Sequence, residues 1–140
     1  MTAKESPEYE RNSEDFRNLA ESWGVLFLTN IRIKEQKDFL KKKSSEVAVT
    51  VNYPNLFPNS IVNIFPYGIL NAHSGDLPRY RGNASQAWAI INGKKRIGLC
   101  ILKIVGGELD NGDVIMKEYL DIDHNTKITE TWRWMGIKTP

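Results

Sequence analysis

Cysteine and histidine are scarce in this sequence. Its 140 residues include one cysteine, Cys100, and two histidines. A single cysteine excludes an internal disulfide, and the cysteine and histidine positions do not have the spacing of a zinc site. Cys100 lies within the apolar run 97–102. We therefore expect a buried structural thiol and no bound metal.

Long apolar segments are also missing. No apolar run approaches the roughly 20 residues that a membrane-spanning helix needs. The N-terminal residues are charged and lack the apolar core of a secretion signal. A glycine-rich nucleotide loop, whether Gly-x-Gly-x-x-Gly or Walker type, is absent too. These absences predict a cytoplasmic protein without a membrane segment and give no support to a dinucleotide or P-loop function.

Positive and negative charges nearly balance. The formal net charge is +2, and 26% of the residues are charged. This balance does not produce the basic stripe of a nucleic-acid-binding protein, so no nucleic-acid partner is expected. The densest basic run, 41–43, is interpreted as the end of a helix, where cations favour the negative end of the helix dipole. A phosphate or RNA contact is the alternative interpretation of that run.

Apolar spacing divides the chain into a polar tail, 1–12, and one domain, 13–140. A helix is expected from Ser13, with Phe16, Leu19, Ala20 and Trp23 on its inner face. The β-branched run 47–51 is typical of a strand that is buried on both sides. Further strands are expected at 25–28, 69–72, 97–105 and 114–122, and further helices at 35–43 and from Thr126.

The same spacing predicts a helix that follows Asn83. Asn83 is expected to cap it, with Ala84, Ala87, Trp88 and Ile91 on the inner face. Alternating strands and helices indicate an α/β fold with a mostly parallel sheet and flanking helices. In such sheets, functional sites form at the carboxyl ends of strands.

Two polar clusters stand at such positions. The first is Gly68-Ile-Leu-Asn71-Ala-His73-Ser-Gly-Asp-Leu-Pro78-Arg-Tyr-Arg-Gly82, and the second is Gly106-Gly-Glu-Leu-Asp110-Asn-Gly-Asp113. Asn71 and His73 are two residues apart, so on a strand they face the same side. An amide, an imidazole and a carboxylate that meet in space suit acyl transfer to an amine.

Each cluster has a structural interpretation as well. Asn71-x-His73 alone is typical of a turn asparagine beside a hydrogen-bonded histidine. Asp110-Asn-Gly112 alone is a hairpin signal. Arg79 and Arg81 alone indicate a solvated loop, whereas in a site their guanidinium groups would bind an anionic group such as a phosphate.

Both clusters together resemble the two signatures of the folate-dependent formyltransferases. Residues 70–82 are similar to the first signature and residues 107–115 to the second, in the family's order, and the resemblance covers 47–137. The family includes enzymes that formylate methionyl-tRNA, glycinamide ribonucleotide and nucleotide-linked amino sugars. The resemblance implies a Rossmann-like fold and 10-formyltetrahydrofolate as the formyl donor.

The resemblance also implies a role for each residue. Asn71 would stabilise the oxyanion, His73 would donate or relay a proton, and Asp110 would orient the histidine and help to deprotonate the amine. The loops 53–58 and 106–110 would flank the pterin. Within these loops, the donor-binding residues would be Leu56, Phe57, Gly107 and Leu109. The substrate-binding residues would be Arg79, Tyr80 and Arg81 of the first signature.

The acceptor is suggested by Gly75 and Asp76, which make the first signature more similar to the amino-sugar branch than to the tRNA branch. We therefore expect a small-molecule amine on a nucleotide-linked sugar. The alternatives are a methionyl-tRNA acceptor, hydrolysis of the donor to formate, and a folate-binding or structural subunit without turnover.

The first residues depart from the family pattern. Family members open with a buried strand, a glycine-bearing turn and a helix, whereas this chain opens with a polar tail and a helix. The comparison predicts a fold that lacks its first strand or strands and is truncated at both ends. An exposed sheet edge would favour association, so a homodimer is one expected state.

Overall fold

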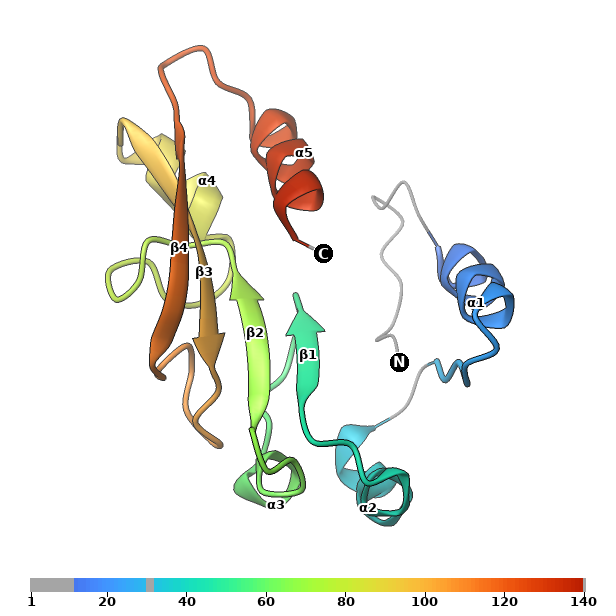
Figure 1. Cartoon of the computed structure of the whole chain (residues 1–140). Helices are drawn as coiled ribbons and strands as arrows, with labels where there is room; N and C mark the ends of the chain where they lie inside the picture. Colours follow the sequence, from blue (N-terminus) through green and yellow to red (C-terminus); the bar gives the residue numbers. More distant parts are fainter. Residues whose placement is uncertain (1–11, 30–31, 140) are drawn as a thin grey trace.

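The computed structural model describes residues 12–29 and 32–139 (Figure 1). Five α-helices, one 3₁₀ helix and four strands are found in these residues. In chain order they are α1 (Ser13–Ser22), η1 (Ile33–Gln36), α2 (Lys37–Lys43), β1 (Ala48–Val51), α3 (Asn59–Val62), β2 (Ile69–His73), α4 (Ser85–Ile91), β3 (Arg96–Lys103), β4 (Val114–Asp121) and α5 (Ile128–Lys138).

The four strands form one sheet in the order β1-β2-β3-β4, which confirms the α/β class. β1 and β2 are parallel, whereas β2–β3 and β3–β4 are antiparallel, so the sheet is mixed where a mostly parallel one was expected. The segment 104–113 between β3 and β4 contains no helix and cannot return the chain for a parallel pairing. The seven residues of α4 span only about 10 Å, which is much shorter than the eight-residue β3. α4 is therefore too short to return the chain along the sheet for a parallel pairing of β2 and β3.

The core is centred on β3. Four of its residues, Ile97, Leu99, Cys100 and Leu102, are almost completely buried, as expected for the apolar run that contains the cysteine. α4 and α5 are joined by a buried hydrogen bond, in which the hydroxyl of Thr131 donates to Gln86 Oε1 at 3.2 Å. A second apolar cluster lies where β1 and β2 begin, and it consists of Leu40, Ile61, Phe65 and Ile69.

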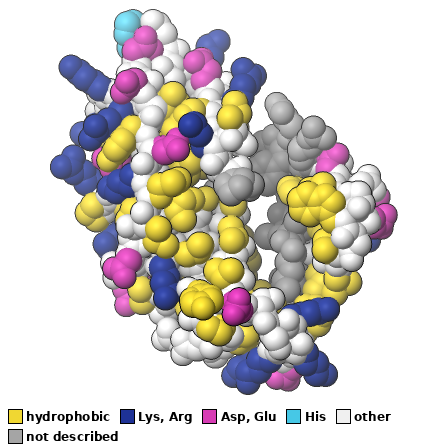
Figure 2. All heavy atoms as spheres, viewed as in Figure 1, with side chains coloured by type: hydrophobic (Ala, Val, Ile, Leu, Met, Phe, Trp, Pro, Cys, Tyr) yellow, Lys and Arg dark blue, Asp and Glu magenta, His cyan; other side chains and the backbone are white. Residues whose placement is uncertain are grey.

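β1 differs from the sequence prediction of a strand that is buried on both sides. Val49 is 67% exposed, and Val51 is exposed as well, whereas Ala48 packs against the cluster at the start of β1. The difference arises because only one face of β1, which is also an edge strand of the sheet, is covered, as its alternating burial shows. Hydrophobic side chains lie on this part of the surface and on α1 (Figure 2).

α1 forms where it was predicted, but its expected inner face is not buried. The side chain of Asn12 caps the helix by accepting from the backbone N–H groups of Glu14 and Asp15. Only Ala20 of the predicted face is buried, and Trp23 is 71% exposed. The strand predicted at 25–28 is wrong, because these four residues have no regular structure and only the next residue, Thr29, takes part in a β-bridge.

α4 begins later than predicted and presents a different face. Ala84, with φ +56°, is the N-cap residue in place of Asn83, and no side chain caps the helix. Ser85, Gln86 and Ala89 are buried, whereas Trp88 and Ile91 are exposed. The predicted inner face was wrong because Ser85 and Gln86 find buried hydrogen-bond partners, which a hydropathy pattern does not register.

The other predicted elements are present with shifted ends. α5 starts at Ile128 instead of Thr126, because the Thr126 side chain closes a turn with Asp123. Thr131 and Met135 are buried, and Trp132 is exposed. In the described part of the chain, no helix combines the length and apolar character that would let it cross a membrane.

The burial of Cys100 gives a test of this core. Burial raises the pKa of the Cys100 thiol, so little reactive thiolate is present at neutral pH. We expect native protein to react with a disulfide reagent at least about 100-fold more slowly than protein unfolded in urea. A Cys100→Ala/Ser22→Cys variant, with its thiol on exposed α1, should react rapidly in both states. Rapid reaction of native Cys100 would contradict the buried position of β3.

Candidate active site

The last residues of β2 carry the two polar side chains of the first cluster. Asn71 and His73 alternate with buried Ala72, so they leave the strand on the same side of the sheet. Thr50 of β1 is the register partner of Asn71, and Cys100 of β3 is the partner of His73. The sheet therefore holds the amide and the imidazole on a strand that is paired on both sides.

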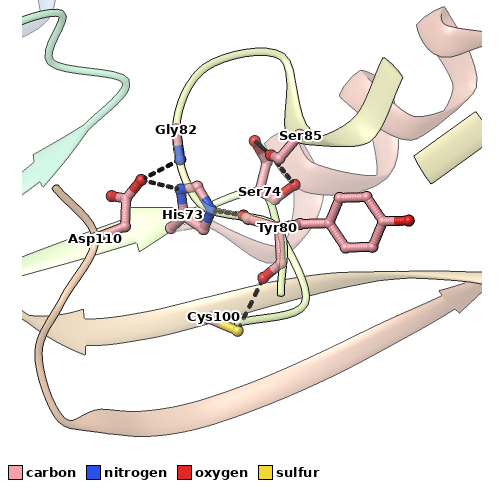
Figure 3. A network of polar contacts seen from close by, with 8 residues as sticks. His73, Ser74, Tyr80, Gly82, Ser85, Cys100 and Asp110 are labelled. Atoms are coloured by element: carbon pink, nitrogen blue, oxygen red, sulfur yellow. Dashed lines mark hydrogen bonds and ion pairs between the residues drawn. The ribbon is translucent and has the colours of Figure 1, made fainter. Parts of the chain in front are cut away.

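Asp110 reaches His73 from the segment between β3 and β4 (Figure 3). Its Oδ2 lies 3.5 Å from His73 Nδ1, and these side chains are 12% and 8% exposed. The same oxygen accepts a hydrogen bond of 2.8 Å from the backbone N–H of Gly82. The carboxylate thus joins the two sequence clusters, and the structure brings His73 and Asp110 together as the sequence predicted.

The second nitrogen of His73 faces the backbone of the loop that follows β2. Nε2 lies 2.6 Å from the carbonyl oxygen of Tyr80. A carbonyl oxygen only accepts, so Nε2 carries a proton and donates it. Nδ1 then faces the Asp110 carboxylate and is the ring atom that contacts it.

Gly75 makes the His73 contact sterically feasible. A Cβ at this position would lie 2.1 Å from the Tyr80 carbonyl oxygen and 2.5 Å from His73 Nε2. Any side chain here would displace the carbonyl that holds the ring. Asp110 also has an unusual backbone, with φ +45°, a left-handed conformation that costs roughly 1 kcal/mol or more and occurs often at functional sites.

A small pocket with a cavity volume of about 50 Å³ opens beside this cluster. It is lined by Thr50, Tyr53, Asn55, Leu56, Phe57, Asn71, Leu102, Ile104, Glu108, Leu109 and Asp110. The side-chain amide of Asn71 makes no hydrogen bond to any residue that the structure describes, so it is available to a ligand. A hydrogen bond of 2.8 Å from Gly107 N–H to the Phe57 carbonyl joins the two loops that form the walls.

The pocket contains most of the residues predicted for donor binding. Leu56, Phe57 and Leu109 line it, whereas Gly107 contributes through its backbone bond to Phe57. Sequence reasoning missed Thr50, Leu102 and Ile104. The place of Thr50 on the strand next to Asn71 was the available signal, because neighbouring strands present paired residues on one face.

The predicted substrate-binding residues do not all reach the pocket. The Tyr80 side chain points away from His73 (Figure 3) and packs against the apolar cluster of Ala89, Ile97 and Ile122. Arg79 is exposed. Arg81 Nη2 donates to Asn111 Oδ1 at 3.1 Å, and the Asn111 amide also contacts the pocket residue Glu108. Arg81 therefore lies at the rim, and Tyr80 reaches the site through its backbone alone.

The arrangement suits acyl transfer. One amide donor and one carboxylate face the same pocket, and an imidazole supports the carboxylate from behind. Within the residues described, no three histidine, cysteine, aspartate or glutamate side chains are grouped so that they could hold a metal ion.

Comparison with known proteins agrees with this geometry. Residues 14–133 match the family model described as formyl transferase. A methionyl-tRNA formyltransferase of Malacoplasma penetrans is 31% identical over 120 residues, which are 86% of this chain and 37% of that protein. The corresponding protein of Rickettsia bellii is 38% identical over 101 residues, 72% of this chain and 32% of its own length. This chain thus spans about a third of the length of these curated relatives.

Solved structures share the fold. The phosphoribosylglycinamide formyltransferase of Bacillus halodurans superposes with a TM-score of 0.76 at 18% identity, covering 97% of this chain and 72% of the other. The likeness in fold, the two signature clusters that meet around the pocket and the family match over residues 14–133 agree with one another. Together they show that this chain belongs to the formyl transferase family.

Proposed function

We propose that this chain transfers a formyl group from 10-formyltetrahydrofolate to a primary amine. The proposal depends chiefly on one observation, that Asn71 and Asp110 line the same pocket while His73 contacts Asp110. The family match and the formyltransferase names of the relatives support the same reaction.

The donor would bind with its pterin between the two pocket loops. Leu56, Phe57 and Leu109 supply apolar contact area for a flat ring, and the Tyr53 ring packs on Phe57 at a centroid distance of 4.5 Å. Polar ring atoms would bond to backbone groups and to the side chain of Glu108 at the pocket edge.

In the proposed reaction the amine nitrogen attacks the formyl carbon and forms a C–N bond. The carbonyl oxygen becomes an oxyanion that accepts a hydrogen bond from the free Asn71 amide. Asp110 takes the proton that the amine loses, and the His73 imidazole, whose Nδ1 lies 3.5 Å from Asp110 Oδ2, holds the carboxylate in position. The bond between the formyl carbon and donor N10 then breaks, and N10 receives the proton, which leaves tetrahydrofolate and the N-formylated product.

The proposed acceptor is a nucleotide-linked amino sugar. Arg79 and Arg81 are exposed cations on the loop that leads from His73 to Gly82, and guanidinium groups bind phosphates well. Gly75 and Asp76 support this choice, because they make the first signature of this chain resemble that of the amino-sugar branch. Methionyl-tRNA is the second candidate, because the curated relatives at 31% and 38% identity bear that name.

An assay with both acceptors tests the proposal. Purified chain and donor are incubated with a panel of nucleotide-linked amino sugars or with methionyl-tRNA, and N-formyl product and free formate are measured by mass spectrometry. We expect N-formyl sugar. If only methionyl-tRNA is formylated, methionyl-tRNA is the acceptor and the amino sugar is not. Formate alone would indicate hydrolysis of the donor, and donor binding without product would indicate a binding subunit. A folded chain that does not bind donor would overturn the proposal.

Removal of the Asn71 amide should slow the chemical step. Asn71→Ala is expected to lower kcat about 10²- to 10³-fold, because one oxyanion donor is lost, and to change the donor KM little. Asn63→Ala, which alters an exposed asparagine just after α3, is the matched control and should retain full activity. Equal rates for the two variants would contradict the oxyanion role.

The pocket wall should determine donor affinity. Leu109→Ala removes about two buried methylene equivalents from the contact, so we expect roughly tenfold weaker binding of a hydrolysis-resistant donor analogue in calorimetric titration. Leu26→Ala is the control, because Leu26 is similarly exposed (60% against 53%) and does not line the pocket. If the two variants bind equally well, the donor does not occupy this pocket.

A further inference from the structure

The loop 74–82 supplies a contact to each member of the His73–Asp110 pair. The Tyr80 carbonyl holds His73 Nε2, and the Gly82 N–H holds Asp110 Oδ2. The loop makes these contacts at its far end. Residues 74–77 lead into this far end, so their position should determine whether the Tyr80 carbonyl contacts the His73 imidazole.

The first half of this loop is fastened to β4 through Asp76. Asp76 Oδ1 accepts from Lys117 Nζ at 3.2 Å and from the Tyr119 hydroxyl at 3.0 Å. Lys117 Nζ also donates to the carbonyl of Leu77. The Tyr119 ring is covered by the guanidinium of Arg96, whose Cζ lies 4.1 Å from the ring centroid. One lysine thus bonds to both a side chain and a backbone group of the loop.

β3 provides close support under the same residues. A Cβ at Gly98 would lie 2.9 Å from the Asp76 Cα, so the loop backbone rests directly on the strand. The Cys100 thiol donates to the carbonyl of Gly75 at 3.0 Å. Gly98 is the register partner of Tyr119, and Cys100 is the partner of Lys117, which places all four on one face of the β3–β4 pair.

From this arrangement we propose that Lys117 is a positioning residue for His73. By holding Asp76 and the Leu77 carbonyl, Lys117 fixes the loop so that the Tyr80 carbonyl stays on Nε2 and Nδ1 stays aimed at Asp110. The catalytic consequence depends on the proposed function, whereas the effect on the imidazole does not.

The bond network distinguishes this contact from an ordinary surface ion pair. An isolated exposed pair contributes little, because water screens it and two long side chains lose freedom. Here Lys117 and Asp76 are 31% and 21% exposed, and each has a second partner. Partial desolvation lowers the pKa of Lys117, but the hydrogen bond and charge of Asp76 raise it by more, so the ammonium stays charged.

Nuclear magnetic resonance of the histidine rings tests the proposal without substrate. The chain has two histidines, so a His73→Gln variant assigns both ring signals. In Lys117→Met we expect the ¹⁵N signals of His73 Nδ1 and Nε2 to shift and broaden, with the His124 signals unchanged. Lys138→Met is the matched control, because it removes another β4 ion pair, Lys138–Glu118 at 3.0 Å, that does not touch the loop. This control should leave both rings unchanged.

Kinetics provides the second readout. Lys117→Met is expected to lower kcat roughly 10- to 100-fold, because small displacements of a catalytic group are costly. Donor KM should change less than twofold, since no residue of loop 74–82 lines the pocket. Lys117→Arg should recover much of kcat by keeping a charged donor. The Asp76→Asn/Lys117→Met double variant should be no slower than Lys117→Met alone, because the two residues act through one contact.

Each outcome bears on the proposal. Unchanged His73 signals in folded Lys117→Met, or an equal effect of Lys138→Met, would overturn it. If Lys117→Met does not fold, Tyr119→Phe removes a single bond to Asp76 and should give a smaller shift of the same His73 signals; unchanged signals there would also overturn it. Altered His73 signals in a chain without formyl transfer would support the positioning role and reject only the proposed function.

Discussion

The contact between His73 and Asp110 is the constraint on which the site depends. It joins the end of β2 to the segment between β3 and β4, and these regions are far apart in sequence. Asp110 makes this contact from a backbone with φ +45°. The absence of a side chain at Gly75 leaves room for the His73 ring and the Tyr80 carbonyl that binds it. Asp110 and Asn71 both line the pocket, and the Asn71 amide has no hydrogen-bond partner among the described residues. The pocket wall, the acid and the imidazole therefore form one connected unit.

Much of this unit was predictable from the sequence. The two signature clusters indicated Asn71, His73 and Asp110, and the loops around Leu56 and Leu109 were predicted to form the donor pocket. The structure brings these residues together because short motifs with fixed turns constrain the backbone locally, and the β2 alternation places residues 71 and 73 on one face. Their chemical roles stay predictions for the variants to test.

The remaining features depend on tertiary contacts that no local pattern contains. The Val49 side chain is exposed because one face of β1 is left uncovered, although the sequence of β1 is typical of a buried strand. α4 turns Ser85 and Gln86 inward because Ser74 and Thr131 offer them hydrogen bonds from distant segments. The Tyr80 side chain packs against an apolar cluster, whereas its backbone carbonyl contacts His73. The residue type alone does not indicate that the backbone and not the side chain reaches the site.

The left-handed backbone of Asp110 narrows the range of sequences that this position accepts. Aspartate and asparagine are the non-glycine residues that adopt such a conformation most readily, because their short side chains bond locally. Glutamate would keep the charge but raise the conformational cost, and glycine would relieve the strain but remove the acid. Asparagine would suit the backbone and lose the charge. Conformation and chemistry thus select the same residue independently, so aspartate is the one side chain that satisfies both at position 110.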